Sequence, residues 1–227
     1  LEHRDHGLLI GTLEGLFQVK GDQKSVFTKA DGLSANKINC LHPDRDGNLW
    51  IGTSNGLNRL DAQTGSITKF TGEDEPGDRE IESIAEGDAK SIFIGTENGL
   101  YQYKNRKFER ISVGKPFETL RYYCIYKDKN DRYWFGTSAG PVSMKGGKPV
   151  LYTTAPQLNE KLIVNVLEDS DGGLWLGSPE GPARVLDIKP GTATGSASLL
   201  NIRLYTKTDG INSTGCTEAG IISEDGT

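Results

Sequence analysis

The chain has 227 residues and a net charge of −5, and 25% of its residues are charged, as on an ordinary water-exposed surface. This acidic balance argues against nucleic acid and anionic membranes as partners, because both require a basic face. No apolar run approaches the length of a membrane span, so membrane attachment would require a segment outside this sequence.

One motif occurs five times along the chain. Its second copy reads Asp46-Gly-Asn-Leu-Trp-Ile-Gly-Thr-Ser-Asn-Gly-Leu57, and every copy has a glycine after a short apolar run. These glycines are spaced 41, 43, 41 and 41 residues apart and are Gly11, Gly52, Gly95, Gly136 and Gly177. A fixed period of about 40 residues indicates a repeat protein, in which each unit needs its neighbours to bury its apolar faces. We therefore expect residues 1–227 to form one array.

Each unit is predicted to contain four short β-strands. In the second unit the strands are expected at 37–41, 48–51, 57–60 and 66–70, bounded by turns rich in Gly, Asp and Asn. Asn55-Gly56, between the second and third strands, is a strong hairpin signal because both turn residues must reach positive φ.

The other units follow the same plan, with departures at their ends. The third is expected from Arg79 to near Ile111, the fourth from Arg121 to near Tyr152, and the fifth from Lys161 to a strand at 201–205. The first unit is expected to lack its innermost strand. The stretch 189–198 is rich in small residues and predicts a flexible loop.

The second strand of each later unit is apolar without alternation, as in Leu49-Trp50-Ile51 and Tyr133-Trp134-Phe135. A strand with one face in water would alternate, so these strands are expected to be covered on both faces. A two-sheet sandwich would bury only one face of each sheet, and the Gly, Asp and β-branched content excludes helical repeats. The predicted fold is therefore all-β, a β-propeller of four-stranded blades.

The end of the sequence resembles the start of a further unit. Residues 214–226 read as an innermost strand followed by its polar turn. Two arrangements fit this pattern: a fragment of a longer propeller of the seven-bladed type, or a five-bladed ring that the tail strand closes. The fragment is the favoured interpretation.

Cysteine and histidine are too scarce and too scattered for a metal or disulfide framework. Cys40 and Cys124 occupy the same column of the repeat and are expected to be small buried residues. His3 and His6 are expected in a turn and His42 at the end of an inner strand, with solvated or capping roles. No cofactor motif is present.

Two recurring patterns have structural explanations. Residues 52–56 and 136–140 both read Gly-x-Ser-x-Gly, as in a hydrolase nucleophile elbow, but no helix follows and the serine column varies, so a hairpin is predicted. Carboxylates recur in the polar turns at Asp44, Asp128 and Asp169. Such repetition indicates turn formation, since Asp side chains bond their own backbone.

Ligand recognition is instead predicted at the positions of the repeat whose residues differ from one unit to the next. In propellers the segment that opens each innermost strand and the hairpin between the second and third strands meet on one face, around the central channel. At these positions the side chains vary in charge and size, and Tyr122 and Tyr123 offer aromatic surface for a sugar ring. The candidate ligand-binding residues are Asn36, Lys37, Asn55, Arg79, Glu80, Asn98, Arg121, Tyr122 and Lys161. No residue is predicted to be catalytic.

The repeat also resembles a known family. Asp31-Gly-Leu-Ser-Ala-Asn36, followed by residues 44–57 and Asp61, is similar to the two-component regulator propeller repeat of bacterial hybrid sensor histidine kinases, and residues 209–213 repeat its opening. The third and fourth units depart from it, with Ala89-Lys90 and Asn130-Asp131 in place of Asp-Gly. The resemblance implies a periplasmic sensor propeller that precedes a membrane segment and a kinase. It also implies a small-molecule or glycan ligand and a homodimer formed through the propeller.

The leading hypothesis is thus a non-catalytic sensing propeller of a two-component receptor that recognises a ligand such as a carbohydrate. One alternative is a propeller-fold polysaccharide lyase or glycosidase, which needs two converging carboxylates or a histidine and a base. Only Glu80 and Asp78 stand near the expected channel mouth. The other alternative is a purely structural platform for protein interaction.

Overall fold

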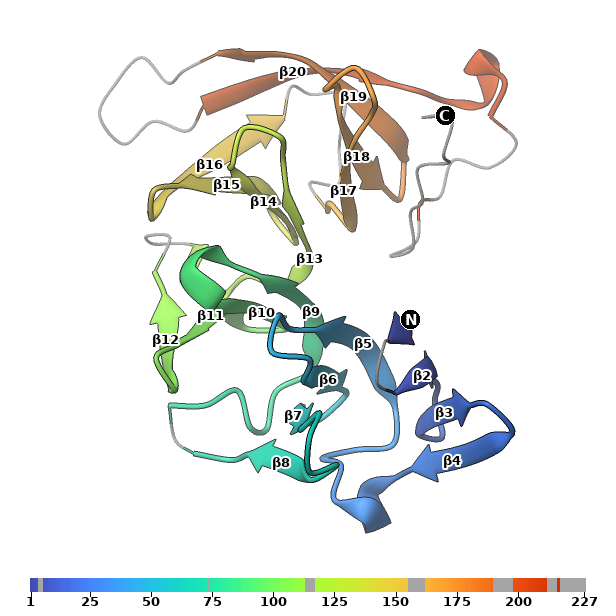
Figure 1. Ribbon diagram of the computed structural model, residues 1–227. Coiled ribbons are helices and arrows are strands. Elements are labelled where there is room, and N and C mark those ends of the chain that lie inside the picture. Colours follow the sequence, from blue (N-terminus) through green and yellow to red (C-terminus); the bar gives the residue numbers. More distant parts are fainter. Residues whose placement is uncertain are drawn as a thin grey trace. The chain divides into compact units, whose positions relative to one another are not determined.

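The computed structural model describes residues 1–3, 6–72, 74–112, 117–154, 162–189, 198–211 and 216. The chain is built of β-strands and divides into two compact units, Leu1–Ser112 and Val113–Thr227 (Figure 1). No helix in the described ranges has the length and apolar character of a membrane span. The predicted all-β fold with four-stranded propeller blades is confirmed.

The first unit contains three antiparallel sheets whose strands are paired in chain order. The first sheet has β1 (Glu2–His3), β2 (Gly7–Gly11), β3 (Leu16–Lys20) and β4 (Gln23–Phe27). The second has β5 (Ile38–Pro43), β6 (Leu49–Thr53), β7 (Gly56–Leu60) and β8 (Ile67–Phe70). The third has β9 (Ile81–Glu86), β10 (Ile92–Thr96), β11 (Gly99–Lys104) and β12 (Lys107–Ile111). Short 3-10 helices lie at Lys29–Asp31 and Asp88–Lys90.

The second unit contains the fourth and fifth sheets. The fourth has β13 (Tyr122–Lys127), β14 (Tyr133–Thr137), β15 (Gly140–Lys145) and β16 (Lys148–Thr154). The fifth has β17 (Asn165–Glu168), β18 (Leu174–Ser178), β19 (Gly181–Lys189) and β20 (Ser198–Leu204). Short 3-10 helices lie at Phe117–Thr119 and Lys207–Asp209. The outer strands β16 and β20 pair in parallel and join the two sheets into one of eight strands.

Three details correct or extend the sequence prediction. The first repeat, which forms the first sheet, has a short innermost strand after all, because Glu2 and His3 pair with β2. Residues 190–197 of the predicted loop lie outside the described residues, as does the predicted tail strand except for Cys216. The Cys216 N–H donates to the Ser178 carbonyl at 3.1 Å, as the Ile38 and Ile163 N–H groups do to Thr12 and Thr137.

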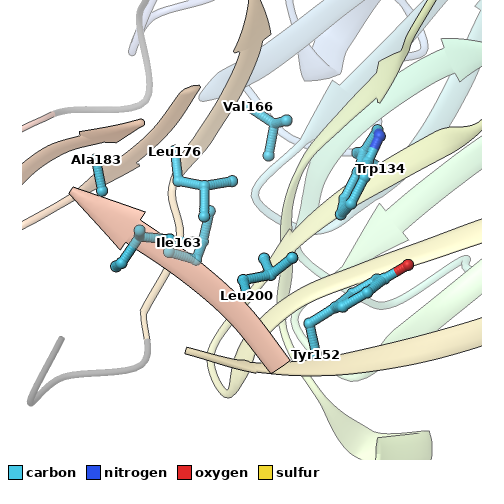
Figure 2. Packing of buried hydrophobic residues seen from close by; sticks show 8 residues of the cluster. Trp134, Tyr152, Ile163, Val166, Leu176, Ala183 and Leu200 are labelled. Atoms are coloured by element: carbon cyan, nitrogen blue, oxygen red, sulfur yellow. The ribbon is translucent and has the colours of Figure 1, made fainter. Parts of the chain in front are cut away.

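Apolar side chains fill the spaces between neighbouring sheets within each unit. Trp50, Leu57 and Phe70 of the second sheet pack with Ile81, Ile92, Ile94 and Tyr101 of the third. In the second unit, Figure 2 shows Trp134 and Tyr152 on one side of a cluster that Leu176 and Ala183 complete on the other. All five residues of β6, β10 and β14 are buried, as the absence of alternation predicts. Each large side chain buried in this way contributes about 1.5–3 kcal/mol.

The first sheet differs on one face. Leu8 and Ile10, which correspond to the buried Leu49 and Ile51 of the second sheet, are each 45% exposed. Phe17 and Val26 extend this apolar face across β3 and β4, at 38% and 44% exposure. The opposite face of the same sheet is buried, because Leu9 and Leu16 pack against the second sheet.

A carboxylate anchors the central tryptophan in three of the sheets. The indole N–H groups of Trp50, Trp134 and Trp175 donate to the carboxylates of the turn aspartates at 2.9, 2.9 and 2.8 Å; these acceptors are Asp44, Asp128 and Asp169. Each aspartate also accepts two backbone N–H groups of its own turn through its other oxygen. One side chain thus closes the turn and satisfies the polar atom of a largely buried ring.

The third sheet lacks both partners of this contact. Phe93 occupies the tryptophan position, and Gly87 occupies the aspartate position. A phenylalanine ring has no N–H to satisfy, so the carboxylate is no longer required. The paired exchange indicates that the turn aspartates serve the tryptophans, which agrees with their structural interpretation from sequence.

We predict that Asp128→Ala lowers the free energy of unfolding of the second unit by about 2 kcal/mol, because the Trp134 N–H and two turn amides lose their acceptor. Chemical denaturation measures the change. In a double-mutant cycle with Trp134→Phe, the two substitutions should be coupled by about 1 kcal/mol or more. Asp171→Ala, at an exposed residue of the equivalent turn in the fifth sheet, serves as the control and should cost under about 0.5 kcal/mol. Additive effects would contradict the contact.

Candidate functional site

The hairpin between the second and third strands is closed by the same hydroxyl-to-carbonyl hydrogen bond in every sheet. In the second sheet, the Thr53 hydroxyl donates to the Gly56 carbonyl at 2.8 Å, and the Asn55 N–H donates back to that hydroxyl at 3.2 Å. Thr12, Thr96, Thr137 and Ser178 donate in the same way. The Gly-x-Ser-x-Gly segments therefore lie in β-hairpins, as predicted, and no helix follows them.

These hairpins form a polar surface together with the residues at the start of the inner strands. In the first unit we call this surface the mouth cluster. Its members are Lys37, Asn39, Arg79, Glu80 and Glu97. The Lys37 ammonium pairs with the Glu80 carboxylate at 3.1 Å. The Glu80 N–H donates to a Glu97 carboxylate oxygen at 3.3 Å, and the Glu97 N–H donates to the Glu80 carbonyl at 3.0 Å. The second and third sheets thus contribute side chains of opposite charge to one surface.

Asn39 is a member of this cluster that the sequence analysis missed. Its amide donates to the Glu80 carboxylate at 3.3 Å and to the Ile81 carbonyl at 3.0 Å. Asn39 lies two residues after Lys37, and the alternation of side chains along an extended segment could have placed both on one side. Asn39 is only partly exposed, and its amide links the Glu80 side chain to the backbone at Ile81.

Arg79 turns its side chain toward the sheets. Its guanidinium carbon lies 5.7 Å from the ring centroid of Tyr101, which is 4% exposed, in cation–π geometry. Its backbone carbonyl accepts the Gly56 N–H at 2.8 Å and thereby ties this loop to the second-sheet hairpin. The Arg79 Nε is buried and has no acceptor among the described residues.

The three predicted asparagines have local structural bonds. The Asn36 carboxamide oxygen accepts the Lys29 N–H at 2.8 Å, while Asn55 and Asn98 donate their backbone N–H groups to Thr53 and Thr96. The Asn55 side chain remains exposed and the Asn98 side chain partly so. Of the three, Asn36 is the one whose amide already has a structural role.

In the second unit the structure corrects one expectation. Tyr122 is 1% exposed and packs edge-on against Phe135, with ring centroids 6.0 Å apart, so its ring offers no surface for a sugar. The Arg121 guanidinium lies 5.9 Å from the ring of the partly exposed Tyr123, which keeps the predicted aromatic character of this surface. Lys161 lies outside the described residues.

The histidines are more buried than expected. His3 and His6 are 7% and 8% exposed, with ring centroids 4.8 Å apart, so they are not solvated turn residues. His42 lies within β5 and is partly buried; burial lowers its pKa, and the carboxylates of Glu86 and Asp44 partly offset this effect. Cys40, Cys124 and Cys216 are all free thiols. Burial raises the pKa of the Cys124 thiol to about 12, as expected for an unreactive packing residue.

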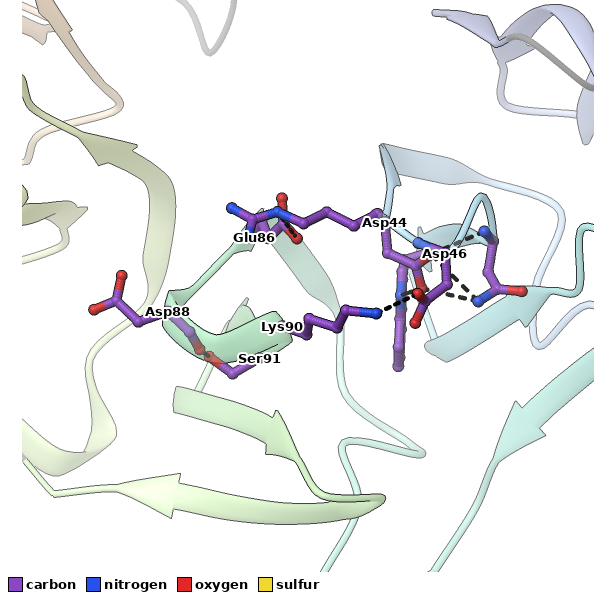
Figure 3. Close-up of polar contacts among 9 residues, drawn as sticks. Asp44, Asp46, Glu86, Asp88, Lys90 and Ser91 are labelled. Carbon is purple, nitrogen blue, oxygen red and sulfur yellow. Dashed lines mark hydrogen bonds and ion pairs between the residues drawn. The ribbon is translucent and has the colours of Figure 1, made fainter.

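A second polar surface lies at the other end of the strands, between the second and third sheets. We call it the Arg59 groove; it has a volume of about 620 Å³ and is lined by Asp44, Asp46, Asn48, Trp50, Arg59, Lys90, Ile92, Tyr103, Asn105 and Arg106. Lys90 reaches across the groove to Asp46 at 2.7 Å (Figure 3). Ala89-Lys90 departs from the Asp-Gly pattern in the sequence, but no site was predicted at this turn.

Comparison with known proteins agrees with this architecture. A model of the two component regulator propeller family matches residues 32–55, 116–139 and 157–180. The matched segments lie at the start of the second, fourth and fifth repeats, so the family model also recognises the fourth repeat, in which Asn130-Asp131 replaces Asp-Gly. They confirm that the chain carries these repeats.

Three similar proteins place the repeats in context. Histidine kinase P4 of Formosa agariphila is 42% identical over 48 residues, which are 21% of this chain and 4% of that protein. The extracellular domain of a hybrid two component system from B. thetaiotaomicron has a TM-score of 0.73 at 17% identity, covering 96% of this chain and 30% of its own. Virginiamycin B lyase from Staphylococcus aureus has a TM-score of 0.63 at 17% identity, covering 81% and 64%. This chain therefore spans about a third of the B. thetaiotaomicron domain and just under two thirds of the lyase, and its match to the kinase is a small part of that protein.

We predict that His42 makes stability depend on pH near neutrality. Because the folded state holds its pKa below the usual 6.5, the unfolded state takes up a proton first as pH falls. Stability should decline as pH falls below about 6.5 and level off below the folded-state pKa. Urea denaturation of the wild type and His42→Gln at pH 7.5, 6.5 and 5.5 measures this, and equal pH slopes in the two proteins would contradict the assignment.

Proposed function

We propose that this chain, which carries two component regulator propeller repeats, is a non-catalytic part of the ligand-sensing region of a bacterial signalling receptor and lies outside the cytoplasm. The B. thetaiotaomicron structure that it resembles is an extracellular domain, and the Formosa relative is a histidine kinase. The first supports a location on the outer side of a membrane, in the periplasm or beyond it, and the second supports a role in signalling.

The observation that carries the proposal is the mouth cluster. The scaffold columns repeat between units, as the Thr/Ser hairpin hydrogen bonds and the aspartate–tryptophan contacts show. The residues that open the inner strands do not repeat, yet they converge: Lys37 and Asn39 from the second sheet meet Glu80 from the third. Side chains that vary at one common surface are typical of a recognition site built on a repeated scaffold.

The chemistry of this cluster suits a neutral, hydroxyl-rich ligand such as a carbohydrate. Lys37 donates and Glu80 accepts, and the exposed Asn55 amide does both, so a sugar hydroxyl finds a donor and an acceptor on the same surface. Lys37 and Glu80 neutralise each other at 3.1 Å, which leaves little net charge to attract an ion. In the second unit, Arg121 over Tyr123 offers a polar group beside an aromatic ring, which suits a sugar in the same way.

The same contacts favour binding over catalysis. A glycosidase requires one carboxylate as the acid and a second as the base or nucleophile, both directed at the scissile bond. The Glu80 carboxylate is instead held by Lys37 and Asn39. The likeness to virginiamycin B lyase concerns the fold alone, at 17% identity.

We predict that Lys37→Met with Glu80→Gln weakens binding of the recognised oligosaccharide by about 10-fold or more, because each lost hydrogen bond to a charged group is worth about 1.5 kcal/mol or more. A panel of neutral oligosaccharides, screened on an array and then by calorimetry, identifies the ligand. Lys24→Met with Glu109→Gln, at exposed positions of β4 and β12, makes the same charge changes elsewhere and should leave binding unchanged.

Two results would overturn the proposal. Undiminished binding by the Lys37/Glu80 variant would remove the site, and release of product from any bound glycan would replace sensing with catalysis. Equal fluorescence-monitored unfolding curves for the two double variants would show that the loss of binding does not arise from unfolding.

A further inference from the structure

The Arg59 groove differs from the mouth cluster in position and in charge. It lies beside the turns that join the first and second strands, whereas the mouth cluster lies at the hairpins that join the second and third. Its volume of about 620 Å³ is within the range of small-molecule sites. Trp50 and Tyr103 form an apolar wall, with ring centroids 5.0 Å apart in an edge-to-face arrangement.

The positive charges in the groove exceed what its own carboxylates neutralise. Asp44 is saturated by the Trp50 indole, the Asn48 amide and two backbone N–H groups, and Asp46 is paired with Lys90. Arg59 and Arg106 form no ion pair within 4 Å with any residue that the structure describes. Two guanidinium groups therefore line a groove whose acidic side chains are already engaged.

The Arg59 guanidinium is held in a fixed position at the groove. Its guanidinium carbon lies 5.8 Å from the ring centroid of Trp50, which fixes the planar group against a rigid aromatic surface. Its Nε is buried and finds no acceptor among the described residues. Arg79 has the same combination of a stacked guanidinium and a buried Nε, so what distinguishes Arg59 is its place in the groove beside Arg106.

Two further basic residues of the groove occupy strained backbone positions. Lys90 has φ 61° and Arg106 has φ 63°, in the left-handed region that disfavours side chains. At the position of Lys90 the second and fifth sheets have Gly47 and Gly172, and the fourth has Asp131; at the position of Arg106 the fourth sheet has Gly147. All of these have positive φ. The third sheet thus has a basic side chain, against the conformational preference, at two turn positions that glycine occupies in several of the other sheets.

The corresponding groove of the second unit shows that this charge is not a property of the repeat. That groove, of about 490 Å³, includes two basic residues, Arg132 and Lys145, against three acidic ones, Asp128, Glu168 and Asp187. Val185 stands where the first unit has Tyr103. The same scaffold can therefore carry a groove of either sign of charge. Of the two grooves, the one in the first unit is basic and has an aromatic side chain at this position.

We propose that the Arg59 groove binds a small organic anion, with a carboxylate, sulfate or phosphate group held between Arg59 and Arg106 and an adjoining ring against Tyr103. Guanidinium groups bind such oxyanions through paired N–H donors, more specifically than ammonium groups do. Lys90 lies at the rim and compensates Asp46, which leaves the two guanidinium groups for the anion. This site is independent of the mouth cluster and of the ligand proposed there.

The strained positions supply the test. Lys90→Gly with Arg106→Gly installs the residue found at Gly47, Gly172 and Gly147 and best suited to positive φ, so the fold should keep or gain thermal stability while the groove loses two charges. Calorimetry with glucuronate, sulfate and inorganic phosphate as probes, and with glucose as the uncharged counterpart of glucuronate, measures binding. We expect the wild type to bind at least one anion and not glucose, and the double variant to bind it at least 10-fold more weakly.

Asp131→Gly is the matched control, because Asp131 has φ 59° in the corresponding turn of the fourth sheet and does not line the Arg59 groove. It should leave anion binding unchanged. Failure of all three anions to bind the wild type at millimolar concentration would overturn the proposal, as would unchanged affinity in the Lys90/Arg106 variant. A fall in melting temperature of that variant would show that the two side chains serve the fold instead. None of these results bears on oligosaccharide binding at Lys37 and Glu80.

Discussion

The hydrogen bond between a turn aspartate and the tryptophan of the next strand joins turn and packing in three of the five sheets. A tryptophan fills the space between two sheets better than any aliphatic residue, but it brings an N–H that must find an acceptor. The aspartate six residues earlier provides it and closes its own turn with the other oxygen. Packing between sheets and the geometry of the inner turn are therefore set by one side chain, repeated in the second, fourth and fifth sheets.

The third sheet shows what happens when this contact is absent. With Gly87 in place of aspartate, no carboxylate gathers the turn amides, and the turn closes instead through the Ser91 N–H and the Asp88 carbonyl. This turn places Ala89 and Lys90 in the left-handed region. The change that frees the turn also directs a lysine toward Asp46 of the neighbouring sheet (Figure 3). A loss in the scaffold has thus altered the chemistry of the adjacent groove.

The sequence predicted the features that recur in every repeat. It did not predict features that depend on contacts between strands or sheets. The glycine period placed every sheet, and apolar runs without alternation identified the buried strands, because both signals are local. The burial of Tyr122 depends on Phe135 in the paired strand, and that of His3 and His6 on their surroundings within the first unit. The parallel pairing of β16 with β20 joins residues more than one repeat apart, such as Tyr152 and Ser198. Asn39 and the Arg59 groove likewise arise from contacts between sheets, which one column of the repeat does not contain.

The two candidate surfaces differ in the balance of their charges, and this balance decides what each can bind. At the mouth cluster, Lys37 and Glu80 compensate each other, so a ligand gains from directed hydrogen bonds and little from net attraction. In the Arg59 groove, two guanidinium groups have no ion-pair partner among the described residues, so attraction to an anion is the dominant contribution. Added salt screens the second kind of interaction far more than the first. A ligand whose affinity falls steeply as ionic strength rises is therefore expected to bind in the Arg59 groove. A ligand whose affinity is insensitive to ionic strength is expected to bind at the mouth cluster.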